Sequence, residues 1–208
     1  MSSSKDGTMV VLSSPSGAGK TTLVKKISKL KNFVTSISHT TRPPRANEKN
    51  GIHYFFINKS KFLELNKKKF FIETAINFGN YYGSTYENLQ YAKKNKKNIL
   101  FDIDWKGARK IRKKINKEDI IDFFILPPSV KELRKRLIRR GRDNSKDINL
   151  RLSYALNEIS HYNEYSYVLI NKNVMKTVND IAHIIKYKCI LEENKKLSDR
   201  KLKSLINF

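Results

Sequence analysis

The chain has 208 residues, of which 39% are hydrophobic and 30% are charged, proportions that fit one globular domain and exclude a largely disordered chain. No stretch approaches the roughly 20 consecutive apolar residues of a membrane-spanning helix, and the first eight residues form no apolar signal segment. We therefore expect a cytoplasmic protein without membrane contact. The single cysteine, Cys189, excludes a disulfide within the chain.

The formal net charge of +24 raises the alternative of a nucleic-acid-binding protein, because a basic surface attracts phosphates. The lysines are spread along the whole chain, however, often beside asparagine, as in residues 67–69 and 93–97. This spread favours a solvated surface over a nucleic-acid footprint, and a salt-dependent DNA-binding assay would separate the two. A positive field of this size would in either case speed the arrival of anionic nucleotides.

The first predicted element is a buried strand at residues 9–12, where four apolar residues follow one another. A helix is expected to begin near Gly19, because Leu23, Ile27 and Leu30 recur on one side of a helical pattern.

Residues 14–21, between this strand and this helix, have the spacing of a P-loop, with Ser14 where the pattern usually has glycine. Such a turn points backbone N–H groups at phosphate oxygens, so we expect ATP here, with Lys20 on the outer phosphates and Thr21 on Mg²⁺. An ordinary glycine-rich turn is the weaker alternative, because Gly-Lys-Thr follows an apolar strand. The expected ATP-binding residues are Ser14, Pro15, Ser16, Gly17, Ala18, Gly19, Lys20, Thr21 and Thr22.

The segment 37–90 differs from the rest, since aromatic strand-like pieces at residues 53–57 and 70–76 flank a short helix near Phe62. We expect an inserted α/β subdomain here. Within it, Arg42 and Arg45 lie three residues apart on a proline-stiffened loop.

Planar guanidinium groups such as these suit a phosphate monoester. Tyr54 and Tyr82 could each donate a hydroxyl to the same phosphate. Glu73 is a lone carboxylate in a mostly apolar strand and needs a partner. A guanine edge, with its N1–H and its amino group, would supply that partner.

A second buried strand is expected at residues 98–103, with Asp102 near its end and Asp104 two residues later. Parallel-sheet enzymes bind ligands at the carboxyl ends of their strands, so Asp102 is the expected acidic partner of Mg²⁺. The alternative is that both acids only cap the helix expected at residues 105–115.

The remaining elements continue the alternation of strand and helix. A strand at residues 120–126 is stopped by two prolines, and Ser129 with Glu132 resembles a capping box that opens the next helix. Residues 139–146 are rich in arginine and poor in apolar residues, and we expect them to form a mobile lid. A helix at 148–159, a strand at 167–170 and a helix at 178–189 follow.

This alternation predicts an α/β fold, a P-loop parallel sheet with helices on both faces. The expected core comprises residues 1–36 and 91–208, with a small lid at about 139–153, and residues 37–90 form the inserted subdomain.

Five segments together resemble the guanylate kinase family: residues 38–45, 79–84, 101–107, 126–129 and 161–165. The similarity runs from about Thr8 to Ile190 and is specific, because several distinct motifs recur in order. The resemblance implies an enzyme that transfers the γ-phosphate of ATP to GMP, giving ADP and GDP, with Mg²⁺ as the cofactor of ATP.

The resemblance also implies roles for single residues. It places Ser38, Glu73, Ser84 and Asp104 on the guanine side of GMP, and Arg42, Arg45, Tyr54 and Tyr82 on its phosphate, with Glu48 lining that site. Arg140 and Arg151 match arginines that close onto the transferring phosphate and ATP, so that the catalytic set is Lys20, Arg42, Arg140 and Arg151. Asn171 matches a position near the adenine, although Lys172 stands where the family commonly has aspartate.

Two further alternatives come from other functional classes. Domains similar to guanylate kinase also serve as non-catalytic interaction scaffolds, but Lys20, Thr21 and Asp102 are intact here. A P-loop kinase for another phosphorylated acceptor would not need Glu73 between Ser38 and Ser84. The sequence leaves the oligomeric state open.

Overall fold

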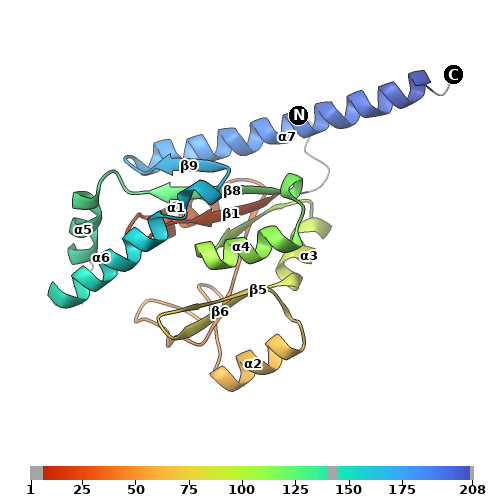
Figure 1. Ribbon diagram of the computed structural model, residues 1–208. Helices are drawn as coiled ribbons and strands as arrows, with labels where there is room; N and C mark the ends of the chain where they lie inside the picture. Colours follow the sequence, from red (N-terminus) through yellow and green to blue (C-terminus); the bar gives the residue numbers. More distant parts are fainter. Residues whose placement is uncertain (1–6, 140–144, 207–208) are drawn as a thin grey trace.

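The computed structural model describes residues 7–139 and 145–206. Its centre is a sheet of five parallel strands in the order β2-β7-β1-β8-β9 (Figure 1). The strands are β1 (Met9–Ser13), β2 (Phe33–Ser36), β7 (Asn98–Asp102), β8 (Ile120–Leu126) and β9 (Tyr167–Ile170). The carboxyl ends of β1 and β7 meet, because Leu12 pairs with Asp102 in the register of these two strands.

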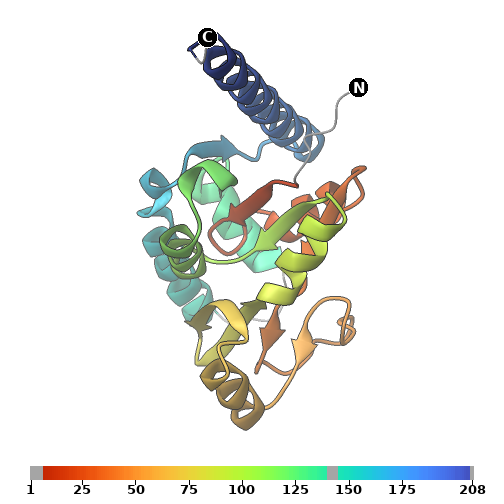
Figure 2. The same ribbon diagram turned by 90° about the vertical axis from the view of Figure 1, so that its right-hand side faces the viewer.

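Helices cover both faces of this sheet, as the sequence predicts. Met9 and Val11 of β1 belong to one buried cluster and Val10 and Leu12 to another, because side chains alternate along a strand. The first cluster includes side chains of α3 (Tyr86–Lys94) and α4 (Trp105–Lys114). The second includes side chains of α1 (Lys20–Ile27) and α7 (Val174–Ile206), the long helix that runs past the body of the molecule in Figures 1 and 2.

A second sheet lies at the opposite end of the molecule from α7 (Figure 2). Its strand order is β4-β3-β6-β5, with β3 (His39–Thr40), β4 (Phe55–Phe56), β5 (Phe71–Asn77) and β6 (Asn80–Thr85). The helix α2 (Lys59–Lys67) covers it, and Phe62 stacks on Phe71 with 4.6 Å between the ring centroids. This sheet forms one wall of the candidate site.

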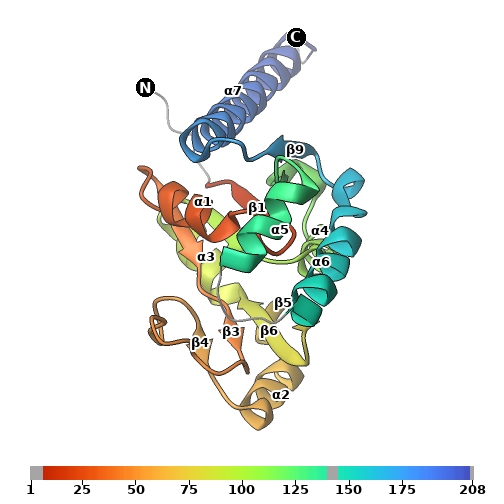
Figure 3. The same ribbon diagram turned by 90° about the vertical axis from the view of Figure 1, so that its left-hand side faces the viewer.

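The helices α5 (Val130–Arg139) and α6 (Ser145–Ile159) pack on one another beside the parallel sheet (Figure 3). Leu133, Leu137 and Ala155 form their shared apolar cluster. The hydroxyl of Ser129 accepts the backbone N–H of Glu132 at 3.1 Å, the first half of the expected capping box. The Glu132 carboxylate instead accepts a hydrogen bond of 2.9 Å from Arg136. Of the expected lid, residues 140–144 lie outside the described part of the chain.

Several boundaries differ from the sequence-based expectation. The helix α1 ends at Ile27, so Leu30 packs on the core from the turn that follows. The strand expected at 53–57 is reduced to β4, because His53 is held in a turn by hydrogen bonds with Lys49. The helix α7 is much longer than the expected 178–189, and β2, β6 and α3 were not predicted. None of the described helices combines the length and apolar character needed to cross a membrane.

Candidate active site

The P-loop connects β1 to α1 and depends on two glycines in the left-handed region of backbone conformation. Gly17 has φ 94° and Gly19 has φ 97°. A side chain is strained in that region, and a Cβ on Gly17 would lie 2.8 Å from Leu133 Cδ1. Ser14 fits its position, and its hydroxyl donates to the carbonyl of Pro15 at 3.0 Å. The loop therefore has the turn that phosphate binding requires.

The Lys20 ammonium lies between the ends of two neighbouring strands. Its Nζ is 2.7 Å from Oδ1 of Asp102 and donates to the carbonyl of Ile103 at 2.9 Å. Burial alone would lower the pKa of Lys20, but the contact with Asp102 and the nearby charges of Asp104 and Glu158 together oppose it, and the net shift is upward. Lys20 is therefore held as a cation at the mouth of the P-loop.

The P-loop and the second sheet face a common pocket of about 250 Å³. Residues of the P-loop form one side, residues of the second sheet and the end of β7 form the other, and Glu158 of α6 also lines it. The pocket residues are Ser14, Pro15, Ser16, Gly17, Gly19, Lys20, Thr21, Ser38, Arg45, Tyr54, Glu73, Ala75, Asn77, Phe78, Tyr82, Asp102, Ile103, Asp104 and Glu158.

Glu73 is the buried carboxylate of this pocket, with 2% of the residue exposed. Its Oε1 accepts hydrogen bonds from the hydroxyl and the backbone N–H of Ser84, at 2.8 and 3.0 Å, and Ser84 in turn contacts the hydroxyl of Ser38 at 3.0 Å. Oε2 has no hydrogen-bond partner among the residues that the structure describes. Burial raises the pKa of Glu73 to about 7, against the opposing effect of Ser84. An acceptor atom is thus available for a ligand.

Arg42 and Glu48 form a bidentate pair beside the pocket. Nη2 of Arg42 donates to both carboxylate oxygens of Glu48, at 2.9 and 2.8 Å, and the backbone N–H of Arg45 donates to Oε2 at 2.9 Å. Burial opposes ionisation of both side chains, but the contacts around them together outweigh it. The pKa of Arg42 is raised, mainly by Glu48, and that of Glu48 is lowered by the backbone N–H of Arg45 and by Arg42. Glu48 therefore orients Arg42, whose guanidinium lies 5.5 Å from the Tyr54 ring centroid.

Asp104 both caps a helix and faces the pocket. Its Oδ1 accepts the backbone N–H of Gly107 at 2.7 Å in the first turn of α4, and its Oδ2 accepts from Nδ2 of Asn77 at 2.6 Å. The capping alternative is therefore correct for Asp104, without removing it from the site. It is wrong for Asp102, which pairs with Lys20 instead.

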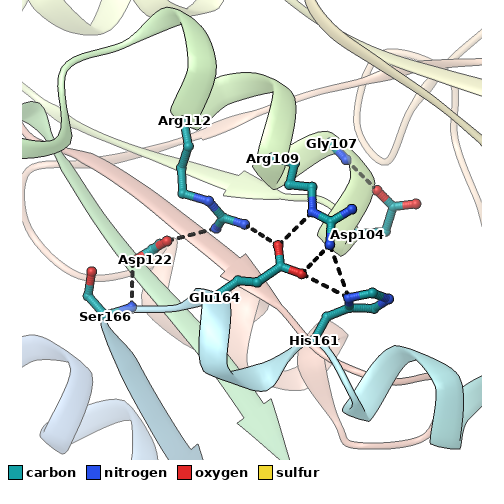
Figure 4. Close-up of polar contacts among 8 residues, drawn as sticks. All are labelled: Asp104, Gly107, Arg109, Arg112, Asp122, His161, Glu164 and Ser166. Carbon is teal, nitrogen blue, oxygen red and sulfur yellow. Dashed lines mark hydrogen bonds and ion pairs between the residues drawn. The ribbon is translucent and has the colours of Figure 1, made fainter.

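An ion-pair network holds α4 in place behind Asp104 (Figure 4). The Glu164 carboxylate, in the short 3₁₀ helix η2 (Tyr162–Glu164), accepts from Arg109 at 2.5 Å and from Arg112 at 3.1 Å. Arg112 also donates to Asp122 of β8 at 2.8 Å, and His161 Nδ1 lies 2.8 Å from Glu164. The network joins α4 to the sheet and to the segment that follows α6.

The oxygens of Thr21 and Asp102 suit Mg²⁺, which needs only one or two protein ligands when phosphate oxygens and waters complete its shell. Both residues line the pocket beside Lys20. In the described part of the chain, no three His, Cys, Asp or Glu side chains gather as a metal site of their own. The donor set thus fits a metal that arrives with a nucleotide.

Comparison with known proteins agrees with this geometry. Residues 6–188 match the family model described as "Guanylate kinase". A guanylate kinase of Mannheimia succiniciproducens is 43% identical over 86% of this chain and 88% of its own length, and one of Rickettsia prowazekii is 45% identical over 86% and 90%. The crystal structure of guanylate kinase from Anaplasma phagocytophilum has a TM-score of 0.75 and 36% identity, over 88% of this chain and 87% of that one.

The chain belongs to the guanylate kinase family. The sequence-based assignment to this family and the predicted α/β fold are both confirmed.

The structure brings most of the expected guanylate kinase site residues together around the pocket. Ser84, Arg42 and Glu48 lie directly behind the pocket wall through the contacts described above. Thr22 is exposed in the first turn of α1. Asn171 is buried behind the P-loop, where its Nδ2 donates to the carbonyl of Ala18 at 2.9 Å. Its expected contact with adenine stays a prediction.

The two arginines expected to close on the phosphates have different outcomes. Arg140 lies outside the described residues. Arg151 lies on α6 and is half-buried, but does not line the pocket in this guanylate kinase-type fold. Its role at the transferring phosphate also stays a prediction.

Five pocket residues were not among the predicted site residues: Ala75, Asn77, Phe78, Ile103 and Glu158. Asn77 could have been found from the alternation of a strand, since Glu73, Ala75 and Asn77 are two residues apart and share a face of β5. Glu158 could have been found from its spacing of seven residues from Arg151, which places both on one face of α6. No comparable signal marked Phe78, which lies in the β5–β6 turn with φ 48°.

Proposed function

We propose that the protein transfers the γ-phosphate of ATP to GMP, giving ADP and GDP. The observation that carries this proposal is that one pocket joins a P-loop to the Glu73 carboxylate. A P-loop alone would identify only a nucleoside triphosphate site. The opposite wall therefore decides the acceptor.

The guanine base is the acceptor base that this wall fits best. Guanine presents two adjacent donors, its N1–H and its amino group, and Glu73 has an Oε2 that lacks a partner among the described residues. Adenine has no N1–H. Its N1 is a hydrogen-bond acceptor, and it would face the carboxylate of Glu73 without a hydrogen to donate. Ser84 holds Glu73 in position and is itself contacted by Ser38, and both serines carry hydroxyls that can turn toward the base. Asp104 lies on the same side of the pocket and is proposed as a further guanine contact.

The GMP phosphate is proposed to bind Arg42, Arg45, Tyr54 and Tyr82. Arg42 is already oriented by Glu48, so little conformational entropy is lost when it meets an anion. Arg45, Tyr54 and Tyr82 line the pocket itself. Their donors suit the oxygens of a phosphate monoester.

ATP is proposed to bind with its outer phosphates in the P-loop, where the backbone N–H groups and Lys20 neutralise them. Thr21 and Asp102 would hold Mg²⁺, which shields the charge of the phosphate oxygens when it is bound. Arg140 and Arg151 are proposed to approach the transferring phosphate. Phosphoryl transfer needs aligned, neutralised reactants rather than a nucleophilic side chain, so these groups suffice.

We further propose that residues 37–90 act as the GMP-binding unit, and that residues 1–36 and 91–208 carry the ATP site. The helix α3 crosses the boundary at residue 90, which would tie the movement of the two parts together. A cytoplasmic location is proposed because both substrates are nucleotides. We propose that the net charge of +24 attracts these anionic nucleotides and does not serve to bind nucleic acid.

The decisive experiment is a coupled assay of ADP formation with GMP, AMP, CMP and UMP offered separately. We expect rapid turnover with GMP alone among these four, and dGMP tests whether the ribose 2′-hydroxyl matters. Equal turnover of AMP and GMP would contradict the proposal. A protein that binds GMP without forming ADP would instead be a non-catalytic member of the family.

A further inference from the structure

A carboxylate occupies one of the backbone donors of the P-loop. Oε2 of Glu158 accepts the backbone N–H of Ser16 at 2.9 Å, across 142 positions of the chain. Backbone N–H groups of a P-loop are the donors that bind phosphate oxygens in proteins of this kind. Glu158 therefore makes, with its own anionic oxygen, a contact of the type that a phosphate makes.

The surroundings of Glu158 do not favour its charge. Burial raises its pKa above the ordinary value, and Ser16 and Lys20 only partly oppose that effect. Lys20 is shared with Asp102, at 2.7 Å. When ATP binds, Lys20 turns to the phosphates, and Glu158 is left as a negative charge beside a polyanion.

Glu158 is also placed on a helix that is expected to act in catalysis. It lies near the end of α6, two helical turns after Arg151 and on the same face, because seven residues make nearly two turns. The apolar contacts of α6 in its cluster are with α5, through Leu133 and Leu137. The contact between Glu158 and Ser16 is thus a polar link from α6 to the P-loop.

We propose that Glu158 is an internal competitor of ATP, a carboxylate that occupies the Ser16 N–H in the free enzyme and is displaced by the incoming phosphates. The proposal rests on the proposed function only in that the P-loop binds ATP. Displacement breaks the link between α6 and the P-loop at the moment when the nucleotide arrives. The free enzyme is thereby held in a state that excludes phosphate from one donor.

The test is calorimetric titration of Mg²⁺–ATP, without GMP, into the wild type and Glu158→Gln. Glutamine keeps a carbonyl oxygen for the Ser16 N–H but removes the charge. We expect ATP to bind about ten-fold more tightly to this variant, a change of about 1.4 kcal/mol. Glu118→Gln is the matched control: it changes the net charge equally at a side chain that is 85% exposed and does not line the pocket, and its ATP affinity should equal that of the wild type.

Glu158→Ala, with its thermal stability measured, removes both the charge and the acceptor. It should also bind ATP more tightly than the wild type. If Glu158 instead anchors α6 while ATP is bound, Glu158→Gln would leave ATP affinity unchanged and Glu158→Ala would weaken it, and either result would overturn the proposal. These ATP affinities are measured without GMP, so they do not depend on which acceptor the enzyme uses. If GMP were not phosphorylated, the proposed function would be refuted, but the result for Glu158 would stand.

Discussion

Glu73 and Ser84 are joined by two hydrogen bonds to the same carboxylate oxygen, one from the Ser84 hydroxyl at 2.8 Å and one from its backbone N–H at 3.0 Å. This arrangement commits Oε1 and leaves Oε2 for a ligand. Burial nevertheless keeps the pKa of Glu73 near 7, so much of the carboxyl group is protonated in the free protein at neutral pH. The proposed recognition of guanine, which needs the ionised form, and the stability of the protein therefore make opposite demands on this residue.

GMP affinity should depend on pH through Glu73. Accepting two guanine donors requires the ionised form, whose population in the free protein rises from about one tenth at pH 6 to about nine tenths at pH 8. We expect the Kd of GMP to fall about ten-fold over this range from Glu73 alone, as measured by calorimetry. The GMP phosphate titrates as well, so Glu73→Gln serves as the reference. An equally steep profile in that variant would show that Glu73 is not the titrating group.

The same variant should be more stable than the wild type at pH 8. The pKa of Glu73 in the folded protein, about 7, is above its ordinary value of 4.5, so ionisation opposes folding and stability falls as pH rises from 4.5 through 7. Glu73→Gln removes this penalty, and its Tm should exceed that of the wild type at pH 8 but not at pH 4.5.

Glu64→Gln is the control for this stability effect. Glu64 lies on α2 of the same insert, and hydrogen bonds from Lys68 and Lys61 lower its pKa to about 2. Its neutralisation should therefore give no stabilisation. A Tm for Glu73→Gln at or below that of the wild type at pH 8 would contradict the assignment of a strained, ionised carboxylate.

Lys20→Ala should abolish turnover while leaving the affinity for GMP largely intact. Lys20 lies on the P-loop side of the pocket, whereas Glu73, Arg42 and Glu48 belong to the proposed GMP-binding unit. Calorimetry with GMP and with ATP, together with the ADP assay, measures the two effects separately. Lys25→Ala, at an exposed position of the same helix, should behave as the wild type. Parallel losses of ATP and GMP affinity in Lys20→Ala would argue against two separate subsites.

Arg112→Ala should destabilise the protein by about 3–5 kcal/mol, because it leaves the carboxylate of Asp122 buried without its partner. The Asp122 side chain is 4% exposed and its Oδ2 lies 2.8 Å from Arg112. Urea unfolding measures the change. Arg134→Ala, at an exposed position of α5, should change the free energy of unfolding by less than about 0.5 kcal/mol. Equal effects of the two substitutions would show that the network of Figure 4 contributes little.

The sequence predicted the parts of the fold whose pattern is local. β8 was predicted with the bounds that the structure shows, because six apolar or aromatic positions, interrupted only by Asp122, are closed by two prolines. β6 was missed because Asn80, Tyr81 and Gly83 carry no apolar alternation; pairing with β5, which has a bulge near Glu73, makes it a strand. Similarly, β2 depends on its parallel pairing with β7 rather than on its own composition.

The site was predictable to the extent that each residue carries a chemical signature. Lys20, Arg42 and Glu73 stand out in sequence by charge and context, and the structure places all three in or beside the pocket. The pairing of Glu48 with Arg42 and the contact of Glu158 with Ser16 could not be predicted, because each depends on how a side chain is aimed in three dimensions.

Gly107→Ala should weaken GMP binding without destabilising the protein. A Cβ at this position would lie 2.7 Å from Oε2 of Glu73 and 3.3 Å from Oδ1 of Asp104, so the carboxylate oxygen that faces the ligand must move. Glu73 is a flexible side chain and can yield, and alanine favours the helix α4 by about 1 kcal/mol over glycine. We therefore expect a Tm equal to or above that of the wild type, a GMP KM raised about ten-fold and an unchanged affinity for ATP. A normal GMP KM with a lowered Tm would mean that Gly107 serves the packing of α4 and that the free oxygen of Glu73 does not bind the acceptor.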